Sequence, residues 1–154
     1  MFASEAVVGR SLVVVLEPGD EVRAGIAAAC RAAGIEAAYV PVFLGAFRET
    51  VLIGGEHPPA DVDEPMPTSV TVVNAEGHGT ATVTAGADGP EVHLHATVGA
   101  KGESARASAG HVISAVVQYH TEVIVVELVS PAMAREPNEA ARGIATLTFA
   151  RDLD

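Results

Sequence analysis

Residues 91–98 read Glu-Val-His-Leu-His-Ala-Thr-Val and alternate between polar and apolar side chains. This period of two predicts a half-buried strand, because residues i and i+2 of a strand project from the same face. His93 and His95 therefore stand side by side on the polar face. The alternation commits this segment to a sheet and places two imidazoles next to each other on it.

The spacing of the two histidines suits a metal ion. Both rings can reach one ion at the usual zinc–nitrogen distance of about 2.1 Å. His111 follows a loop that contains three glycines, and we expect that loop to bring its ring back over the strand. These residues predict a metal site at His93, His95 and His111 with an open fourth position. Histidines on the polar face of a strand are also ordinary solvated residues, and spacing alone leaves that alternative open.

Length and charge limit the kind of protein. The 154 residues suit one domain with a core of its own. Aromatic residues make up only 4% of the chain, so Val, Ala, Leu and Ile build that core. The formal net charge is −11, and such a chain repels phosphate backbones. We therefore expect no direct binding of nucleic acid.

The compartment is indicated by cysteine usage and hydropathy. Cys30 is the single cysteine, which excludes an internal disulfide and fits a reducing compartment. No apolar run approaches the roughly 20 residues that span a bilayer, so no membrane segment is expected. The first apolar run follows Glu5 without a basic leader, which argues against a signal peptide. We expect a cytoplasmic protein.

One helix is clearly indicated. Residues 11–16 read as a strand that ends at the turn Pro18-Gly19. Asp20 is the expected N-cap of a helix whose apolar residues repeat at helical spacing from Val22 to Ala33, and Gly34 is the expected stop. Cys30 falls on the apolar stripe and is expected to be inert packing.

The remainder reads as strands and loops. Residues 54–67 are an acidic, proline-rich loop, and residues 131–143 are a polar loop with one helical turn near 138–142. Strands are expected at residues 37–44, 46–53, 69–75, 79–85, 112–119 and 122–129, with residues 144–150 closing the sheet. With no βαβ alternation, the fold class is α+β, with an antiparallel or mixed sheet of about eight strands and one main helix.

The turn before the histidine strand sets its register. An even-numbered turn centred between residues 87 and 88 pairs Thr82 with His93 and Thr80 with His95, and puts His78 on the same face. His78 is then a candidate fourth ligand or catalytic group. A one-residue slip would turn it to the opposite face.

Metal-assisted chemistry also needs proton-transferring and substrate-binding groups. Glu127, Glu122 and His78 are candidates for the first role. Arg48 is conspicuous within the apolar residues 37–53, and it is either a clamp for an anionic substrate or a solvated edge residue.

The order of motifs resembles the plant and prokaryote conserved (PPC) domain, in its stand-alone prokaryotic type. The likeness covers residues 10–149 within a single domain of residues 1–154. The matching segments are Glu17-Pro18-Gly19-Asp20-Glu21, residues 42–48, Glu76-Gly77, residues 92–98, Gly110-His111-Val112 and residues 121–128.

This resemblance implies a homotrimer that carries zinc or another divalent metal at His93, His95 and His111. It also implies a fold similar to metal-dependent acetolactate decarboxylases. Plant members owe DNA binding to a separate Arg-Gly-Arg-Pro segment that this chain lacks. Residues 68–73 also depart from the plant pattern Gly-Arg-Phe-Glu-Ile-Leu, which weakens any partner-binding role borrowed from plants.

Two functions follow from these expectations. The first is a metal-dependent enzyme of lyase or hydrolase type that acts on a small anionic or carbonyl substrate. The second is a non-catalytic trimeric binding or regulatory module whose metal site is structural or vestigial.

Overall fold

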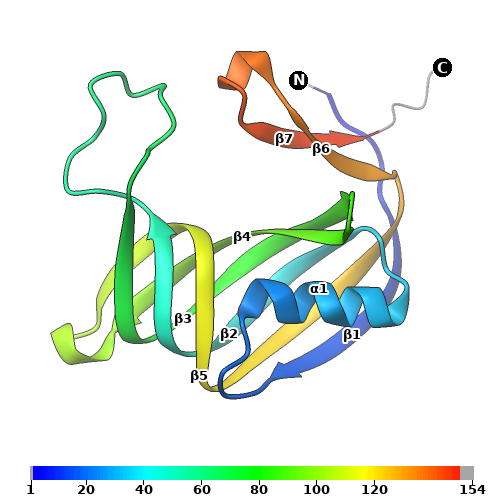
Figure 1. The fold of residues 1–154 in the computed structure, drawn as a ribbon. Helices are drawn as coiled ribbons and strands as arrows, with labels where there is room; N and C mark the ends of the chain where they lie inside the picture. Colours follow the sequence, from blue (N-terminus) through cyan, green and yellow to red (C-terminus); the bar gives the residue numbers. More distant parts are fainter. Residues whose placement is uncertain (1, 150–154) are drawn as a thin grey trace.

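The computed structural model describes residues 2–149, which contain one α-helix and seven strands (Figure 1). The strand count is therefore seven rather than about eight, and the α+β class is consistent with the arrangement. The elements are β1 (Val7–Leu16), α1 (Val22–Ala33), β2 (Ala38–Ile53), β3 (Ser69–Gly86), β4 (Gly89–Ala100), β5 (Arg106–Ser130), β6 (Met133–Pro137) and β7 (Ala145–Phe149), with short 3-10 turns η1 (Lys101–Glu103) and η2 (Glu139–Ala141).

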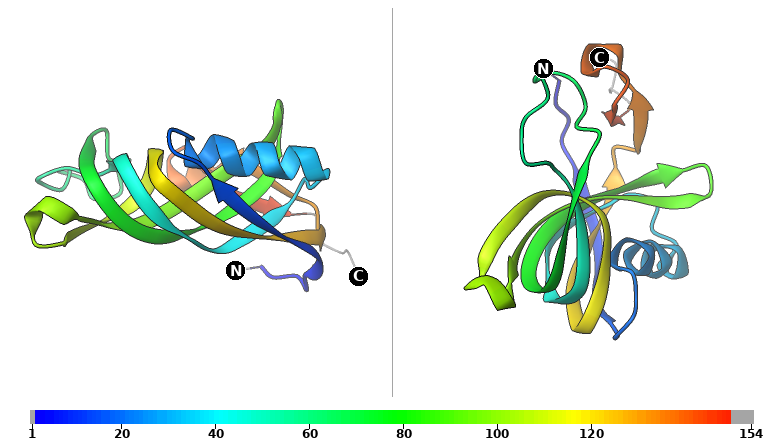
Figure 2. Two further views of the ribbon diagram at one scale, coloured as in Figure 1. Left: turned by 90° about the horizontal axis from the view of Figure 1, so that it is seen from below. Right: turned by 60° about the vertical axis from the view of Figure 1, so that its left-hand side comes forward.

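The main sheet is antiparallel and curls back on itself. Its strand order is β1-β5-β2-β3-β4, and β5 also pairs with β4, which joins β5, β2, β3 and β4 into a ring. Closure depends on the 25 residues of β5, whose first part pairs with β4 and whose later parts pair with β2 and β1. The curl of the strands and the position of α1 against them are visible in Figure 2. The result is a barrel-like sheet in which β4 and the start of β5 lie side by side.

Three of the long strands were expected as pairs of shorter ones. The breaks expected near Gly45, between residues 75 and 79, and near His120 are absent. Gly45 lies where a Cβ atom would collide with the side chain of Thr121 on β5. Glycine at that position permits the close approach of two paired strands and does not turn the chain. Bending is instead taken up by bulges, one of them between Val40 and Phe43.

Helix α1 begins one residue later than expected. The N-cap is Glu21, whose carboxylate accepts hydrogen bonds from the backbone N–H of Ala24 at 2.8 Å and of Ala115 at 3.2 Å. Asp20 is not the cap, because its carboxylate accepts from the backbone N–H of Glu17 at 2.8 Å and closes the preceding turn. Gly34 has φ 67° and ends the helix as expected.

The segment after β5 forms a hairpin of its own. Strands β6 and β7 pair with each other, from Met133 opposite Phe149 to Pro137 opposite Ala145. The expectation that residues 144–150 close the main sheet is wrong for the described residues, and residue 150 lies outside them. The alternation of β7 correctly indicated a strand, but alternation carries no information about its partner. The hairpin lies above the main sheet in Figure 1, with β6 in contact with β3.

The core has the expected aliphatic character. It consists of valine, alanine, leucine and isoleucine around the Phe43 and Phe47 rings, which meet edge to face with centroids 6.3 Å apart. Cys30 is fully buried on α1, and burial raises the pKa of its thiol. Among residues 2–149, no helix is long and apolar enough to cross a bilayer.

Candidate metal centre

The hairpin of β3 and β4 has the register expected from the turn. Gly86 lies opposite Gly89, Thr82 opposite His93 and Thr80 opposite His95. The same register puts His78 opposite Thr97 on the same face. The apolar residues of β4 point the other way and are buried, as a half-buried strand requires.

The third histidine arrives by strand pairing. Residues 101–105 form a tight turn, and β5 then runs back antiparallel to β4 with His111 directly opposite His95. We expected a flexible glycine loop to fold His111 over the strand. A hairpin register does so instead, and it gives the ring a defined position.

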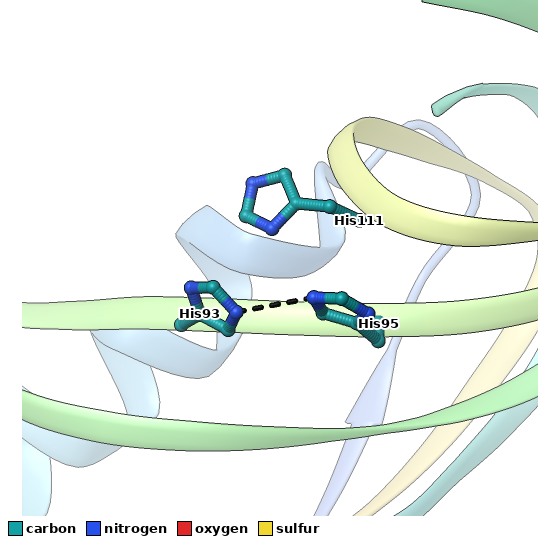
Figure 3. A group of neighbouring side chains, drawn as sticks. All are labelled: His93, His95 and His111. Carbon is teal, nitrogen blue, oxygen red and sulfur yellow. Dashed lines mark hydrogen bonds between the residues drawn. The ribbon is translucent and has the colours of Figure 1, made fainter. Parts of the chain in front are cut away.

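Three imidazoles converge on one face of this hairpin (Figure 3). The candidate ligand nitrogens of His93, His95 and His111 all lie within 4.8 Å of one another. The two Nε2 atoms of His93 and His95 are 3.1 Å apart, and the ring centroids are separated by 4.7 to 5.3 Å. Tetrahedral zinc with bonds of about 2.1 Å holds its ligand nitrogens about 3.4 Å apart. The donor set therefore fits one divalent ion with small side-chain rotations.

The electrostatics of the cluster favour neutral rings. Burial lowers the pKa of His93 to about 4, assisted by the positive charge of Arg135 and by the neighbouring imidazoles. Burial also lowers the pKa of His111, with smaller contributions from His95, Arg23 and Arg135. Both rings are deprotonated at neutral pH, which is the form that binds a metal.

Arg23 fixes the two strands that carry the histidines. It projects from α1, and its Nε donates to the backbone carbonyl of Val92 at 3.2 Å while Nη1 donates to that of Ile113 at 2.9 Å. Val92 precedes His93, and Ile113 is two residues after His111. Arg23 is therefore a positioning residue that ties the helix to both strands.

Arg135 approaches the cluster from the β6–β7 hairpin. Its Nη2 donates to Oγ1 of Thr82 at 2.9 Å, and its Nη1 donates to the carbonyl oxygen of Ala145 at 3.4 Å. Because Thr82 is the cross-strand partner of His93, the guanidinium lies beside the histidine cluster. Sequence reasoning missed this residue, since its segment was read as a loop and no local pattern connects it to β3.

Glu127 lies on the other side of the sheet. Glu127 on β5 is paired with Ala38 on β2, Ala38 with Val83 on β3, and Val83 with Val92 on β4, so these side chains share one face of the sheet. His93 follows Val92 along β4 and therefore points to the opposite face. Arg10 holds the Glu127 carboxylate with Nε at 3.0 Å and Nη2 at 3.1 Å. These hydrogen bonds lower the pKa of Glu127 to about 2. Glu127 therefore forms a structural ion pair with Arg10, which links β5 to β1.

The other candidates are distributed differently. Arg48 is exposed on β2 and lies far from the histidines. Its neighbour Glu49 pairs with Val73, which is nine residues along β3 from Thr82, the partner of His93. Glu122 borders an apolar groove on β1, β2 and β5. The structure does not bring Arg48 or Glu122 to the imidazoles.

His78 is the expected assisting residue that shares a groove with one of the three histidines, His95. It lies with Thr80, His95 and Thr97 along an open groove of about 330 Å³. This groove and Arg135 flank the histidines from opposite ends, because His78 is four residues from Thr82 along β3.

The chain matches a known protein family in sequence. A family model described as the Plants and Prokaryotes Conserved (PCC) domain matches residues 3–129. This match confirms the resemblance found in the motifs. No curated protein matches the chain significantly in sequence.

Three solved structures have similar folds over nearly the full chain. The plant- and prokaryote-conserved protein of Pyrococcus horikoshii is 21% identical, with a TM-score of 0.76 and coverage of 100% of this chain and 99% of that one. A metal-containing protein from Archaeoglobus fulgidus is 24% identical, with a TM-score of 0.75 and coverage of 96% and 99%. A candidate DNA-binding protein from Bacteroides thetaiotaomicron is also 24% identical, with a TM-score of 0.74 and coverage of 95% and 99%.

The fold is also similar, to a lesser degree, to that of an enzyme. Acetolactate decarboxylase from Bacillus subtilis subspecies spizizenii is 18% identical, with a TM-score of 0.52, and the match covers 77% of this chain and 53% of that one. The expected similarity of fold is confirmed, and at this identity it concerns the fold alone.

Proposed function

The chain belongs to the Plants and Prokaryotes Conserved (PCC) domain family, and from that premise we propose that it is a homotrimeric metal-dependent enzyme. Each chain binds one divalent ion, zinc or a metal of similar preference, through His93, His95 and His111. The reaction is of lyase or hydrolase type on a small anionic or carbonyl substrate. The observation that supports this most strongly is the convergence of three imidazole nitrogens within 4.8 Å on one face of the β4–β5 hairpin.

The donor set determines what chemistry is open to the site. Three neutral imidazoles leave a bound ion its full charge and an open position, so that it can polarise a carbonyl or lower the pKa of its bound water to about 7. His95 is exposed, and the adjoining groove gives a small molecule access to the same face. We propose that His78, which lines this groove, acts as a general acid or base through an imidazole nitrogen.

An exchangeable water on the ion distinguishes the enzyme from a closed structural site. We expect Cu²⁺-loaded protein to enhance the relaxation of bulk water protons clearly above the level of Cu²⁺ bound to EDTA, because the three imidazoles leave a position open. Water-proton relaxation at equal copper concentrations measures this difference. Relaxation no greater than that of the EDTA complex would contradict the proposed open site.

The second candidate is a non-catalytic binding or regulatory module with a structural or vestigial metal site. It is favoured by the positions of Glu127 and Arg48, neither of which reaches the imidazoles. The relaxation experiment separates the two candidates, because a capped ion supports the module. Direct binding of nucleic acid is not part of either proposal, given the net charge of −11.

The proposed trimer is supported by an apolar surface on β1, β2 and β5. Val13 is 77% exposed and Val15 is 55% exposed, and Leu44 lies near them with 46% exposed. With Val42 and Ile124 they border a groove of about 420 Å³. Large apolar side chains that are exposed next to one another mark interaction sites. We propose that neighbouring chains of the trimer cover it.

Charge placed on this surface is expected to disrupt assembly. Val13→Asp puts a carboxylate into the proposed contact, where burial without a partner is unfavourable. We expect light scattering to give three times the 15.7 kDa chain mass for the wild type and a lower mass for Val13→Asp. Val62→Asp is the matched control, because Val62 is 79% exposed in the loop between β2 and β3. A wild-type monomer, or a trimer unaffected by Val13→Asp, would contradict the proposal.

A further inference from the structure

We infer that the ligand of this site is a small oxyanion, a carboxylate or a phosphate, which binds the ion through one oxygen and the guanidinium of Arg135 through another. This inference rests on the proposed metal site and deepens it by naming the ligand class. It assigns to Arg135 the anion-binding role that the sequence suggested for Arg48.

The position of Arg135 is fixed by two hydrogen bonds. Nη2 is held by Oγ1 of Thr82 on β3, and Nη1 by the carbonyl of Ala145 on β7. Directly paired residues of neighbouring strands have Cβ atoms about 4.5 to 5.5 Å apart, so a group held on Thr82 is next to His93. A ligand of a few atoms is long enough to bridge the ion and this guanidinium.

The charge of Arg135 is not neutralised by the residues around it. Both of its hydrogen-bond acceptors are uncharged, and its Nε is a buried donor without a hydrogen-bond partner. Arg135 forms no ion pair with any residue between 2 and 149. Glu91, two residues before His93, is the acidic side chain with an electrostatic effect on it. Nη1 and Nη2 each use one of their two N–H groups in these bonds, so each keeps a second N–H group with which to bind a ligand.

The surrounding charges select an anion. A divalent ion at the three histidines would lie close to Arg135, with Arg23 behind the two histidine strands. A negatively charged ligand relieves the repulsion among these groups. Arginine presents a planar fork of donors that matches the two oxygens of a carboxylate or phosphate. The groove at the other end of the cluster, beyond His95, is lined by His78, Thr80 and Thr97 and offers no large apolar side chain, so that side does not favour an apolar ligand either.

The test uses Co²⁺-loaded protein, whose visible absorption reports ligands entering the coordination sphere. Acetate and inorganic phosphate are titrated separately into wild type, Arg135→Gln and the control Arg106→Gln, which replaces an exposed arginine at the start of β5. We expect at least one anion to bind the wild type, and Arg135→Gln to weaken it by about tenfold or more. We expect the affinity of Arg135→Gln for Co²⁺ itself to stay within a few-fold of wild type. Arg106→Gln is expected to match wild type in its affinity for the anion and in its affinity for Co²⁺.

A second variant keeps the test decisive if Arg135→Gln does not fold. Thr82→Val preserves the shape of the side chain and removes the hydroxyl that holds Nη2, so it is expected to weaken the anion severalfold while Co²⁺ binding persists. A response to acetate alone, to phosphate alone or to both supports the inference and identifies the oxyanion. No response to either, or equal affinity in wild type and the variants, overturns the inference and leaves the metal site intact. Failure of the wild type to bind Co²⁺ overturns the metal site as well.

Discussion

Replacement of His111 by alanine is expected to lower zinc affinity by more than about 100-fold, since loss of a group that merely orients a metal ligand already costs about 10- to 100-fold. The two remaining imidazoles, both from β4, would leave the ion with only two of its three protein ligands. Competition with a chromogenic chelator measures the change. The fold is expected to persist, because the His111 side chain lies on the partly exposed face and the buried neighbour Val112 is kept.

The matched control is His57→Ala. His57 is an exposed histidine in the loop between β2 and β3, so this variant removes one imidazole from the chain without touching the cluster. We expect it to bind zinc as the wild type does. Retention of wild-type zinc affinity by His111→Ala would show that the three rings do not act together.

Gly79→Ala is expected to destabilise the protein by about 3 kcal/mol or more, the upper end of the usual cost of overpacking. A Cβ atom on Gly79 would collide with the carbonyl oxygen of His95 and with the ring of Phe43. The carbonyl belongs to the β3–β4 ladder and the ring to the core, so neither yields easily. Urea denaturation of the metal-free protein measures the loss, and zinc affinity is expected to fall with it because His95 is displaced.

Gly102→Ala serves as the control for this substitution. Gly102 lies in the 3-10 turn η1, and a Cβ atom there would have no neighbour within 4 Å. We expect its unfolding free energy to remain close to wild type. Equal stability of Gly79→Ala and Gly102→Ala would contradict the close packing of β3 against β4.

The histidine pair and its register were predictable because both depend on short-range rules. Alternation over residues 91–98 sets the face, and the turn that places Gly86 opposite Gly89 sets the pairing of Thr82 with His93. Helix α1 was predictable in the same way, from the helical spacing of its apolar residues and from Gly34 at its end. These features depend on residues close together in the sequence.

Features that depend on distant contacts were not predictable. Gly45 was read as a break because glycine usually weakens a strand, whereas here the reason for it is the side chain of Thr121 on β5. Glu127 is held by Arg10, which is 117 positions away along the chain. Arg135 reaches the histidines only because β6 and β7 pair apart from the main sheet. No local pattern records any of these contacts.

Zinc-edge X-ray absorption of the zinc-loaded protein tests the convergence of the three imidazoles most directly. We expect one zinc per chain with three imidazole nitrogens at about 2.0 to 2.1 Å and one further light-atom ligand in the open position. Two or fewer imidazole nitrogens on the zinc would contradict the account.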